Sequence, residues 1–284
     1  MRTIWLAVLL GVLGLVACAD SIYGTSGNTY DDQARVLAAC GAKKCGVSNG
    51  VTCGTCPTGQ GCTGAHQCAD VPAGMLWVPG GTLTLGASDL SNNPSHSVTL
   101  SDYQMDVTEV TVGAYKGCVD ATKCSTPDTT TYCNWSVTGR EKHPINCVDW
   151  QQATDFCSWA GKRLPTEEEW EYAARYDDSR DYPWGNTAPS ATLANYGNTD
   201  GTMAVGSYPA GNSKLGIQDL AGNVWEWTNS WYCDTTPPCT SGSSRVLRGG
   251  SWSNVSSYLR AAYRFYFYPS FRFYSYGFRC ARTP

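Results

Sequence analysis

The sequence predicts an α+β domain with short strands, two helices and much irregular structure, preceded by a small disulfide-rich module. Three observations support this fold class. The residues from Met75 to the end of the chain are numerous enough for one sizeable domain. The chain contains 30 glycines and 11 tryptophans and its apolar runs are short, which favours short strands and much irregular structure. Six cysteines crowd residues 40–68, a stretch too small to hold a core without bridges.

Two helices can be predicted from local patterns. The first covers residues 149–160, where apolar residues recur at helical spacing and Gly161 follows as a C-cap. The second begins at Thr166, whose hydroxyl can cap the amide of Glu169 while the Glu169 carboxylate reaches back, which is a capping box. Acidic residues in a first turn also suit the helix dipole. We therefore assign these glutamates to capping and to the surface, and not to acid–base catalysis.

The first 17 residues predict export. Arg2 is followed by an apolar run over residues 4–16, which is too short to span a bilayer comfortably. The run ends in Leu-Val-Ala-Cys, which resembles the lipobox of bacterial lipoproteins. We expect residues 1–17 to be a cleaved signal peptide and Cys18 to carry a lipid anchor at the outer membrane or cell surface. The alternative is an ordinary signal peptide with Cys18 incidental. The polar residues 18–39 then form a flexible spacer.

The other cysteines fit an oxidising compartment. Fourteen of the 15 cysteines remain after Cys18, an even number that allows every thiol to pair. Cys53 and Cys56 form a single C-x-x-C, which in this setting indicates a structural bridge more than zinc or redox chemistry. Cys233 and Cys239 are close enough in sequence to close a local loop. Spacing leaves the pairing among four others open, namely Cys118, Cys124, Cys133 and Cys147.

The charge of the chain excludes one class of partner. Its formal net charge is −4 and it has no runs of lysine or arginine. Nucleic-acid binding needs a basic stripe that displaces phosphate counterions, so we expect no nucleic-acid partner.

Seven motifs occur in the order of one known family. They are MLWVPGGTLTLG (75–86), VTEVTVGAY (107–115), HPINCVDWQQATDFCSWAGKRLPTEEEWEYAAR (143–175), YPWGN (182–186), LGIQDLAGNVWEWTNSWY (215–232), RVLRGGSW (245–252) and GFRCA (277–281). Together they resemble the formylglycine-generating enzyme, or sulfatase-modifying factor, family across nearly all of residues 75–284. The resemblance implies a variant of the C-type lectin fold with two helices and small sheets, and a disulfide between Cys157 and Cys280.

The resemblance does not carry over the chemistry of the family. Its enzymes oxidise a sulfatase cysteine with two cysteines of their own, which bind copper and follow the RGGS motif. The matching positions here are Asn254 and Leu259, and neither side chain can be a thiolate nucleophile or a soft copper ligand. We therefore expect no bound copper, no catalytic residues and no oxidase activity.

Two calcium sites of the family have matching positions in this chain, and oxygen ligands suit this hard cation. The expectation is structural calcium, and the alternative is that the carboxylates only bind loop amides. The resemblance assigns one site to Asp219, Gly222, Val224 and Glu226, and the other to Asn195, Tyr196, Asp200 and Thr202.

The C-terminal segment has an unusual composition. Twelve of the 27 residues from Trp252 to Phe278 are aromatic, and no Asp, Glu or Lys follows Asp234. Tyrosine and serine with occasional arginine is the composition of an antibody paratope, because rigid rings supply contact area at low entropic cost. A contiguous exposed aromatic patch favours association unless a ligand covers it. The alternative is that these rings pack the loops of the domain itself.

A second resemblance concerns the same segment. The layout is similar to the variable proteins of diversity-generating retroelements, in which a C-type lectin domain carries a hypervariable region framed by motifs such as RGGSW and GFR. There, randomised adenines convert Asn codons into codons for residues such as Ser, Tyr, Phe and Val. We expect a variable binding region over 252–278 with these ligand-binding positions: Ser253, Asn254, Val255, Ser257, Tyr258, Tyr263, Phe265, Tyr266, Phe267, Tyr268, Phe271, Phe273, Tyr274, Ser275 and Tyr276.

The residues between these positions would form an invariant framework. Ser256 and Ser270 fit either class. The framework set is Leu259, Arg260, Ala261, Ala262, Arg264, Pro269 and Arg272.

These features predict a surface-displayed lipoprotein that binds an extracellular protein or glycan through its C-terminal face and is anchored to the membrane by its lipid. A formylglycine-generating-type enzyme or accessory factor is the alternative. A structural cell-envelope protein with glycan affinity is a third possibility. The ligand cannot be read from the sequence.

Overall fold

The computed structural model describes residues 47–48, 51–52, 56, 60–62, 67–176, 178, 180–234 and 237–284. The predicted signal peptide, the lipidation site Cys18 and the spacer lie outside the described residues. The chain divides into two compact units, Met1–Val71 and Pro72–Pro284. Within the described residues no helix has the length and apolar character needed to cross a membrane.

The described residues of the first unit form two strand pairs and a disulfide between Cys56 and Cys68. Cys53, the partner of Cys56 in the C-x-x-C motif, lies outside the described residues. The antiparallel pairs are β1 (Val47–Ser48) with β2 (Val51–Thr52), and β3 (Gln60–Cys62) with β4 (Cys68–Asp70).

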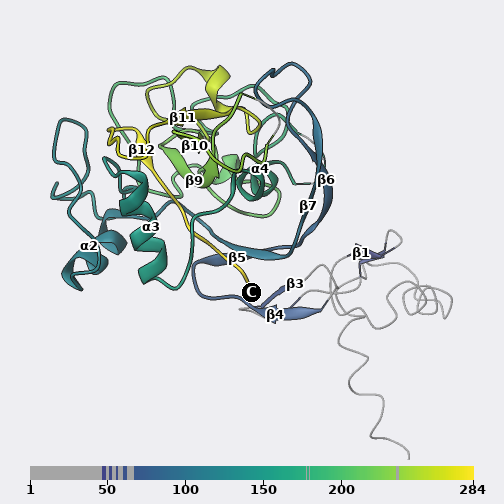
Figure 1. Ribbon diagram of the computed structural model, residues 1–284, viewed down its shortest axis with the longest axis horizontal. Coiled ribbons are helices and arrows are strands. Elements are labelled where there is room, and N and C mark those ends of the chain that lie inside the picture. Colours follow the sequence, from purple (N-terminus) through teal and green to yellow (C-terminus); the bar gives the residue numbers. More distant parts are fainter. Residues whose placement is uncertain are drawn as a thin grey trace, which may run out of the picture. The chain divides into compact units, whose positions relative to one another are not determined.

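The second unit holds small sheets surrounded by long loops, as the family resemblance implies (Figure 1). Its largest sheet has the order β11-β10-β9-β12, in which only the β12–β9 pairing is parallel. These strands are β9 (Trp225–Trp231), β10 (Arg245–Arg248), β11 (Phe265–Phe267) and β12 (Tyr276–Gly277). The smaller sheets are formed by β5 (Met75–Val78), β8 (Tyr103–Asp106) and β13 (Ala281–Arg282), and by β6 (Gly81–Leu85) with β7 (His96–Leu100).

Both predicted helices are present. Helix α3 (Trp150–Trp159) follows Asp149, which makes a capping box with Gln152. Helix α4 (Glu167–Arg175) has the predicted capping box, because the Thr166 hydroxyl accepts from the Glu169 amide and the Glu169 carboxylate accepts from the Thr166 amide.

A third helix, α2 (Val112–Asp120), was not predicted. Its signal was present, since Thr111 caps it and its buried residues lie at helical spacing: Val112, Tyr115 and Cys118. Within the part of this unit that the structure describes there are also two short 3₁₀ turns, η2 (Pro209–Gly211) and η3 (Ser256–Leu259).

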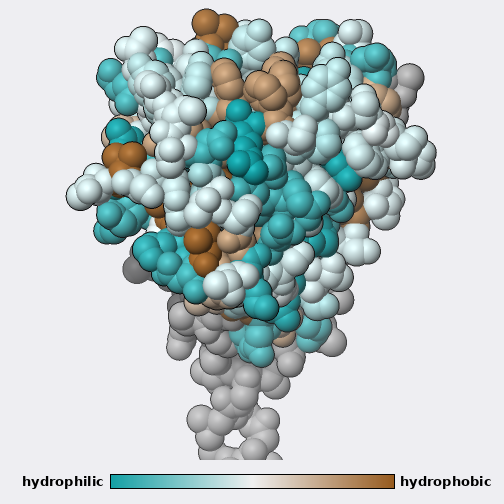
Figure 2. Space-filling model, turned by 60° about the vertical axis from the view of Figure 1, so that its left-hand side comes forward, coloured by the Kyte–Doolittle hydropathy of each residue, from teal (hydrophilic) through white to brown (hydrophobic). Residues whose placement is uncertain are grey.

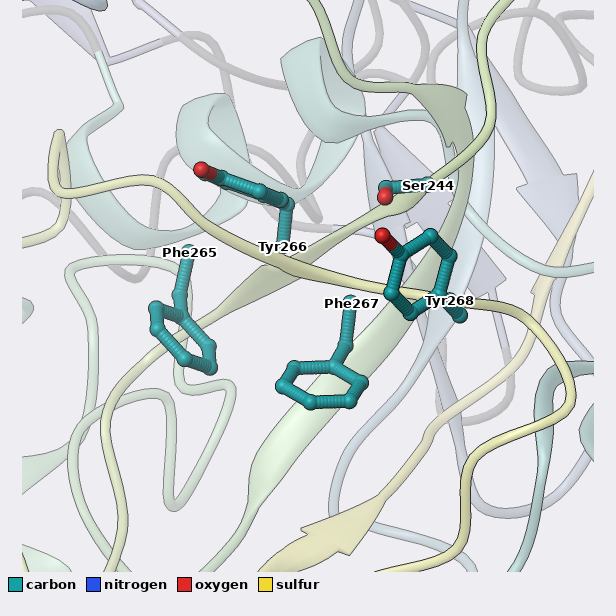
Figure 3. A pocket seen from close by; sticks show the side chains of 5 residues that line it. All are labelled: Ser244, Phe265, Tyr266, Phe267 and Tyr268. Atoms are coloured by element: carbon teal, nitrogen blue, oxygen red, sulfur yellow. The ribbon is translucent and has the colours of Figure 1, made fainter.

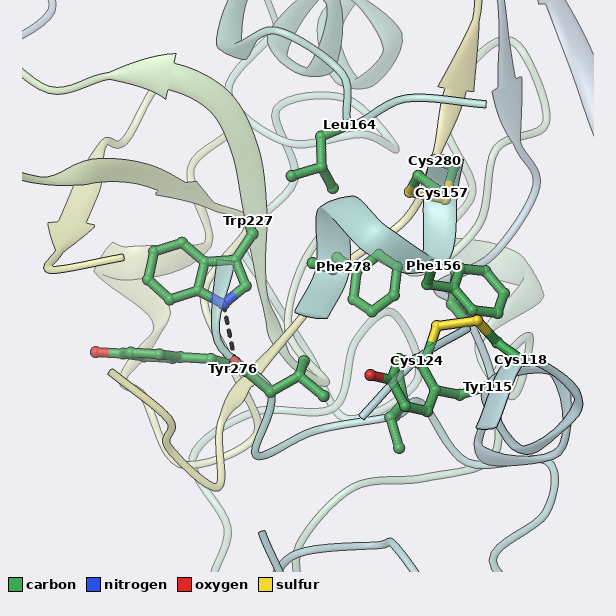
Figure 4. Packing of buried hydrophobic residues seen from close by; sticks show 14 of the residues in the cluster. Tyr115, Cys118, Cys124, Phe156, Cys157, Leu164, Trp227, Tyr276, Phe278 and Cys280 are labelled. Atoms are coloured by element: carbon green, nitrogen blue, oxygen red, sulfur yellow. Dashed lines mark hydrogen bonds between the residues drawn. A yellow bond between two sulfur atoms is a disulfide. The ribbon is translucent and has the colours of Figure 1, made fainter. Parts of the chain in front are cut away.

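The core between α2, α3 and the large sheet is built from rings and disulfides (Figure 4). Tyr115 stacks on Phe156, and Phe278 packs edge-on against both. The indole of Trp227 donates a hydrogen bond to the Val148 carbonyl over 3.0 Å.

Four disulfides of this unit lie within the described residues. The two predicted pairs are confirmed, Cys157–Cys280 and Cys233–Cys239. The pairing that spacing left open is Cys118–Cys124 and Cys133–Cys147.

Candidate binding face

The C-terminal segment lies on a layer of buried ion pairs that begins in α4. The prediction that the α4 glutamates lie on the surface is wrong: Glu167, Glu168, Glu169 and Glu171 are all buried. Glu167 accepts two hydrogen bonds from the guanidinium of Arg264, at 2.6 and 3.0 Å. Because both partners are 0–1% exposed, this pair is inside the domain and ties the C-terminal segment to α4.

A buried glutamate with two arginine partners continues this layer. Glu171 binds both Arg175 and Arg248, and all three side chains are buried. Burial opposes the charge on Glu171, but Arg248 and Arg175 outweigh it and hold the pKa of Glu171 below its usual value. Arg248 also donates to the Tyr263 carbonyl over 2.7 Å, so the layer reaches the backbone of the aromatic segment.

The predicted framework positions within the segment are buried or bind neighbouring parts of the domain. Leu259, Ala261, Ala262 and Arg264 are buried. The two remaining framework arginines are partly exposed and each binds two carboxylates: Arg260 binds Asp89 and Asp181, and Arg272 binds Asp149 and Asp128. The Pro269 carbonyl accepts from the Trp150 amide.

Most of the predicted ligand-binding positions lie at the surface. Six of the side chains are exposed, with Val255 and Tyr268 at 61%, and seven are partly buried. The exposed positions are Ser253, Val255, Ser257, Tyr266, Tyr268 and Phe271. The partly buried positions are Asn254, Tyr258, Tyr263, Phe265, Phe267, Phe273 and Tyr274.

Two predicted positions are wrong as surface residues. Ser275 is 3% and Tyr276 4% exposed. Both lie where β12 pairs with β9, since the Ser275 carbonyl accepts from the Trp225 amide and the Tyr276 ring packs in the core against Trp227. Both residues are of the types found at the exposed positions, but they lie in the interior of the domain.

The rings of the segment form a row that is continuous only through the buried Trp225 ring, which contacts both Tyr263 and Phe265. Neighbouring ring centroids lie 4.1 to 6.5 Å apart, and most of these distances are within the range of favourable aromatic pairs. We call this row the ring face: Tyr258, Tyr263, Phe265, Phe267, Phe271, Phe273 and Tyr274. Five of the seven rings pack against the core, all except Phe271 and Tyr274, and every ring of the face remains at least partly exposed.

Strand β11 divides the aromatic side chains between two directions. Figure 3 shows Tyr266 pointing to the opposite side of the strand from Phe265 and Phe267, as alternation along a strand requires. Tyr266 stacks on Tyr232 with centroids 3.7 Å apart. An open hollow of about 210 Å³ borders the strand. It is lined by Ser244, Phe265, Tyr266, Phe267 and Tyr268. Sites that enclose a drug-sized molecule occupy roughly 300–1,000 Å³, so the hollow suits a single side chain better.

The positions that match the family's copper cysteines have structural roles. Leu259 is fully buried in an apolar cluster with Ala194 and Ala221. The Asn254 amide oxygen accepts from the Ser251 hydroxyl over 2.6 Å, and its carbonyl accepts from the Gly197 amide.

The residues matched to the first calcium site do not all fit that role. Both carboxylate oxygens of Glu226 accept hydrogen bonds from Arg279, and one of them also accepts from the Trp170 indole. A guanidinium in that position opposes a bound cation. Asp219 accepts from the Gly206 amide, and burial raises the pKa of its carboxyl. Gly222 and Val224 could offer only backbone oxygens.

The residues matched to the second calcium site are also bound internally. Asn195 accepts from Asn198 and donates to Asn223, while the Thr202 hydroxyl accepts from Asn134. Tyr196 donates to a carbonyl, and Asp200 is exposed. No group of three or more metal-ligating side chains occurs within the described residues. Calcium binding stays a prediction. Of the eight matched residues Glu226 fits least well as a ligand, because Arg279 already binds both of its oxygens.

One exposed ring at this face was not predicted. Tyr132 contacts Trp252 and Tyr274, with ring centroids 5.1 and 5.8 Å away, and is 48% exposed. It lies about 120 residues before the aromatic segment, in a loop without any periodic pattern. Only its position next to Cys133 hinted that its backbone is constrained.

The described domain is an α+β, C-type-lectin-like fold whose surface segment is held on a buried polar framework. The chain belongs to the sulfatase-modifying factor enzyme 1-like family, whose model matches residues 63–284. It is 30% identical to the formylglycine-generating enzyme of Mus musculus over 278 residues, which covers 73% of this chain and 74% of that protein. It is 42% identical to the hercynine oxygenase of Mycolicibacterium thermoresistibile over 146 residues, but spans only 33% of that protein.

Solved structures show the same scaffold. Treponema denticola variable protein 1 has a TM-score of 0.63 at 27% identity, covering 74% of this chain and 95% of that one. PvdO from Pseudomonas aeruginosa has a TM-score of 0.65 at 25% identity, covering 74% and 94%. The domain is therefore of the kind that a variable protein uses as its scaffold.

Proposed function

We propose that this protein is a surface-displayed lipoprotein that binds a ligand through the ring face, with the ring-face residues diversified by a retroelement and no oxidase step. The observation that carries the proposal is the division within one segment. Six of its seven framework residues are buried or ion-paired, whereas Tyr, Phe and Ser side chains cover its outside. Such a segment tolerates changes on its surface because its fold depends on other residues.

Display at the surface is supported by the lipobox-like sequence at Cys18 and by the number of disulfides. Disulfides persist in oxidising compartments. The anchor, the spacer and the Cys-rich module would hold the binding domain away from the membrane. Labelling the cells with a lipid precursor, followed by Cys18→Ser, tests this part: the variant should lose the lipid.

Diversification is tested by sequencing the locus in independent isolates. The proposal expects a nearby reverse transcriptase and a template repeat that differs from the gene mainly at adenines. It also expects differences between isolates at ring-face codons and identical codons at Leu259 and Arg264. Isolates that vary equally at both classes of position would refute it.

An enzymatic function is the second candidate, because the chain is 30% identical to a formylglycine-generating enzyme. Incubation of the full chain with copper and a sulfatase-motif peptide decides between them. We expect no aldehyde, since Asn254 and Leu259 supply no thiolate. Aldehyde formation would support the enzyme and contradict the binding proposal.

A further inference from the structure

We propose that Tyr132 is a fixed contact residue of the binding face and that the complete face takes an uncharged, apolar patch on a partner protein. This inference rests on the proposed function and names the partner class of the same site. It adds a residue from outside the C-terminal segment, one that diversification of that segment would leave unchanged.

The first observation is the continuity of the rings. Tyr132 contacts Tyr274, which lies at one end of the ring face, and its ring also covers Trp252. Trp252 is only 3% exposed, so Tyr132 is the outermost ring at this end. A partner that covers Tyr274 would therefore meet Tyr132 as well.

The second observation is the rigid attachment of Tyr132 to the segment. The buried Asn146 amide donates one hydrogen bond to the Tyr132 carbonyl over 2.8 Å and another to the Tyr274 carbonyl over 2.6 Å. Its oxygen accepts from the Asn134 amide, and the Cys133–Cys147 disulfide closes the same loop. One side chain thus fixes the backbones of both tyrosines at once.

The backbone of Tyr132 is also strained. Its φ is 66°, in the left-handed region that a bulky side chain rarely adopts. Such a conformation persists only where the surroundings impose it, and strained residues cluster at functional sites. Here the strain holds a half-exposed aromatic ring beside the ring face and not in the core.

The chemistry of the face favours a protein over a glycan. After Asn254 the chain contains no Asp, Glu, Asn, Gln, His or Lys. Arg264 and Arg279 are buried, and Arg260 and Arg272 each bind two carboxylates. Sugar hydroxyls that are buried without partners are costly, and beyond Asn254, apart from its arginines, the segment offers only Tyr and Ser side-chain hydroxyls to satisfy them.

An apolar protein patch needs few such partners. Tyr and Phe anchors dominate the centres of protein interfaces, where charged residues are depleted. On the face of the molecule drawn in Figure 2, separate brown residues lie among teal and near-white ones, without a continuous brown patch. A Tyr side chain combines an apolar ring with a polar hydroxyl, so exposed tyrosines can bind an apolar patch and still keep the free protein soluble.

The test places a photo-reactive p-benzoylphenylalanine at single positions of the full chain. Separate variants carry it at Tyr132, at Phe271 on the ring face and at Trp159, an exposed ring on α3 that lies outside the face. Cells displaying each variant are irradiated, and the adducts are identified by mass spectrometry. We expect the same polypeptide at Tyr132 and Phe271 and not at Trp159.

Each other outcome has a definite meaning. An adduct at Phe271 without one at Tyr132 overturns the role of Tyr132 and leaves the proposed function intact. Glycan adducts overturn the protein partner. No adduct at either position contradicts the proposed function itself.

Once the partner is identified, a matched pair of variants measures the contribution of the ring. Tyr132→Phe keeps the ring and should bind like the wild type, whereas Tyr132→Ser should weaken binding about tenfold, as for a moderate interface hot spot. The unfolding midpoint of both variants is measured in parallel. Equal affinities for the two variants would contradict the proposal.

Discussion

Helix α4 and the C-terminal segment invert the usual distribution of residues. The helix is rich in glutamate yet every one of its residues is buried, whereas the segment is rich in rings yet leaves several of them exposed. The two are joined by the ion pair of Glu167 with Arg264. We infer that the buried polar network determines the backbone path of the C-terminal segment. The aromatic side chains of the segment are then not required to fix that path.

The largest effect is expected from removing one member of the network. Arg264→Met leaves Glu167 buried without its partner, which should lower the free energy of unfolding by about 3–5 kcal/mol. Denaturant unfolding measures this. Arg282→Met, at an exposed position on β13, is the control and should change stability by less than about 0.5 kcal/mol. Similar losses in both variants would show that the network does not hold the segment.

A smaller effect is expected where the segment meets the Tyr132 loop. Asn146→Ala leaves the carbonyls of Tyr132 and Tyr274 without their donor. Unsatisfied buried groups cost about 1–3 kcal/mol, which thermal unfolding can detect. An unchanged melting temperature would indicate that water replaces the amide and that the two backbones are not rigidly coupled.

A further prediction concerns Glu109, a buried acid outside this network, and the dependence of stability on pH. Burial, with a smaller contribution from Asp219, raises the pKa of Glu109 well above its usual value. The folded protein therefore keeps this proton to higher pH than the unfolded chain. Its stabilisation is complete below the ordinary carboxyl pKa and is lost as pH rises through the raised value.

Glu109→Gln should flatten this profile. The variant should match the wild type in acid and unfold less readily than the wild type at alkaline pH, as seen in unfolding curves between pH 4 and 9. The flattening should be partial, because burial also raises the pKa of Asp219. A profile identical to the wild type would mean that Glu109 ionises as readily in the folded protein as in the unfolded chain.

The smallest effect on stability is expected at the surface. Tyr268→Ser combined with Phe271→Ser removes two rings that are 61% and 41% exposed. The free energy of unfolding should change by no more than about 1 kcal/mol, while ligand binding is lost. A loss of several kcal/mol would place these rings in the structural framework.

Much of the fold could be predicted because its signals are local or motif-based. The capping box at Thr166, the Gly161 stop and the Cys157–Cys280 pair are examples. The burial of Glu167 could not, because a capping pattern looks the same on a buried and on an exposed helix. Its partner Arg264 lies 97 residues away and nothing local connects them.

The sequence predicted the residue types of the candidate site better than it predicted which positions lie at the surface. Ser275 and Tyr276 are of the same residue types as the side chains of the face, but a short parallel pairing with β9 buries them. Tyr132 had no compositional signal at all. The separation of face from framework follows from three-dimensional pairing, which residue types alone do not encode.

The most direct test of this separation is a comparison of two libraries. In one, the seven ring-face positions are randomised among Ser, Asn, Val, Tyr and Phe. In the other, Leu259, Ala261, Ala262 and Arg264 are randomised with the same residues. The fraction of each library that resists protease while displayed on cells is then measured. We predict that most of the ring-face library remains folded and that little of the framework library does; equal fractions would contradict the division between face and framework.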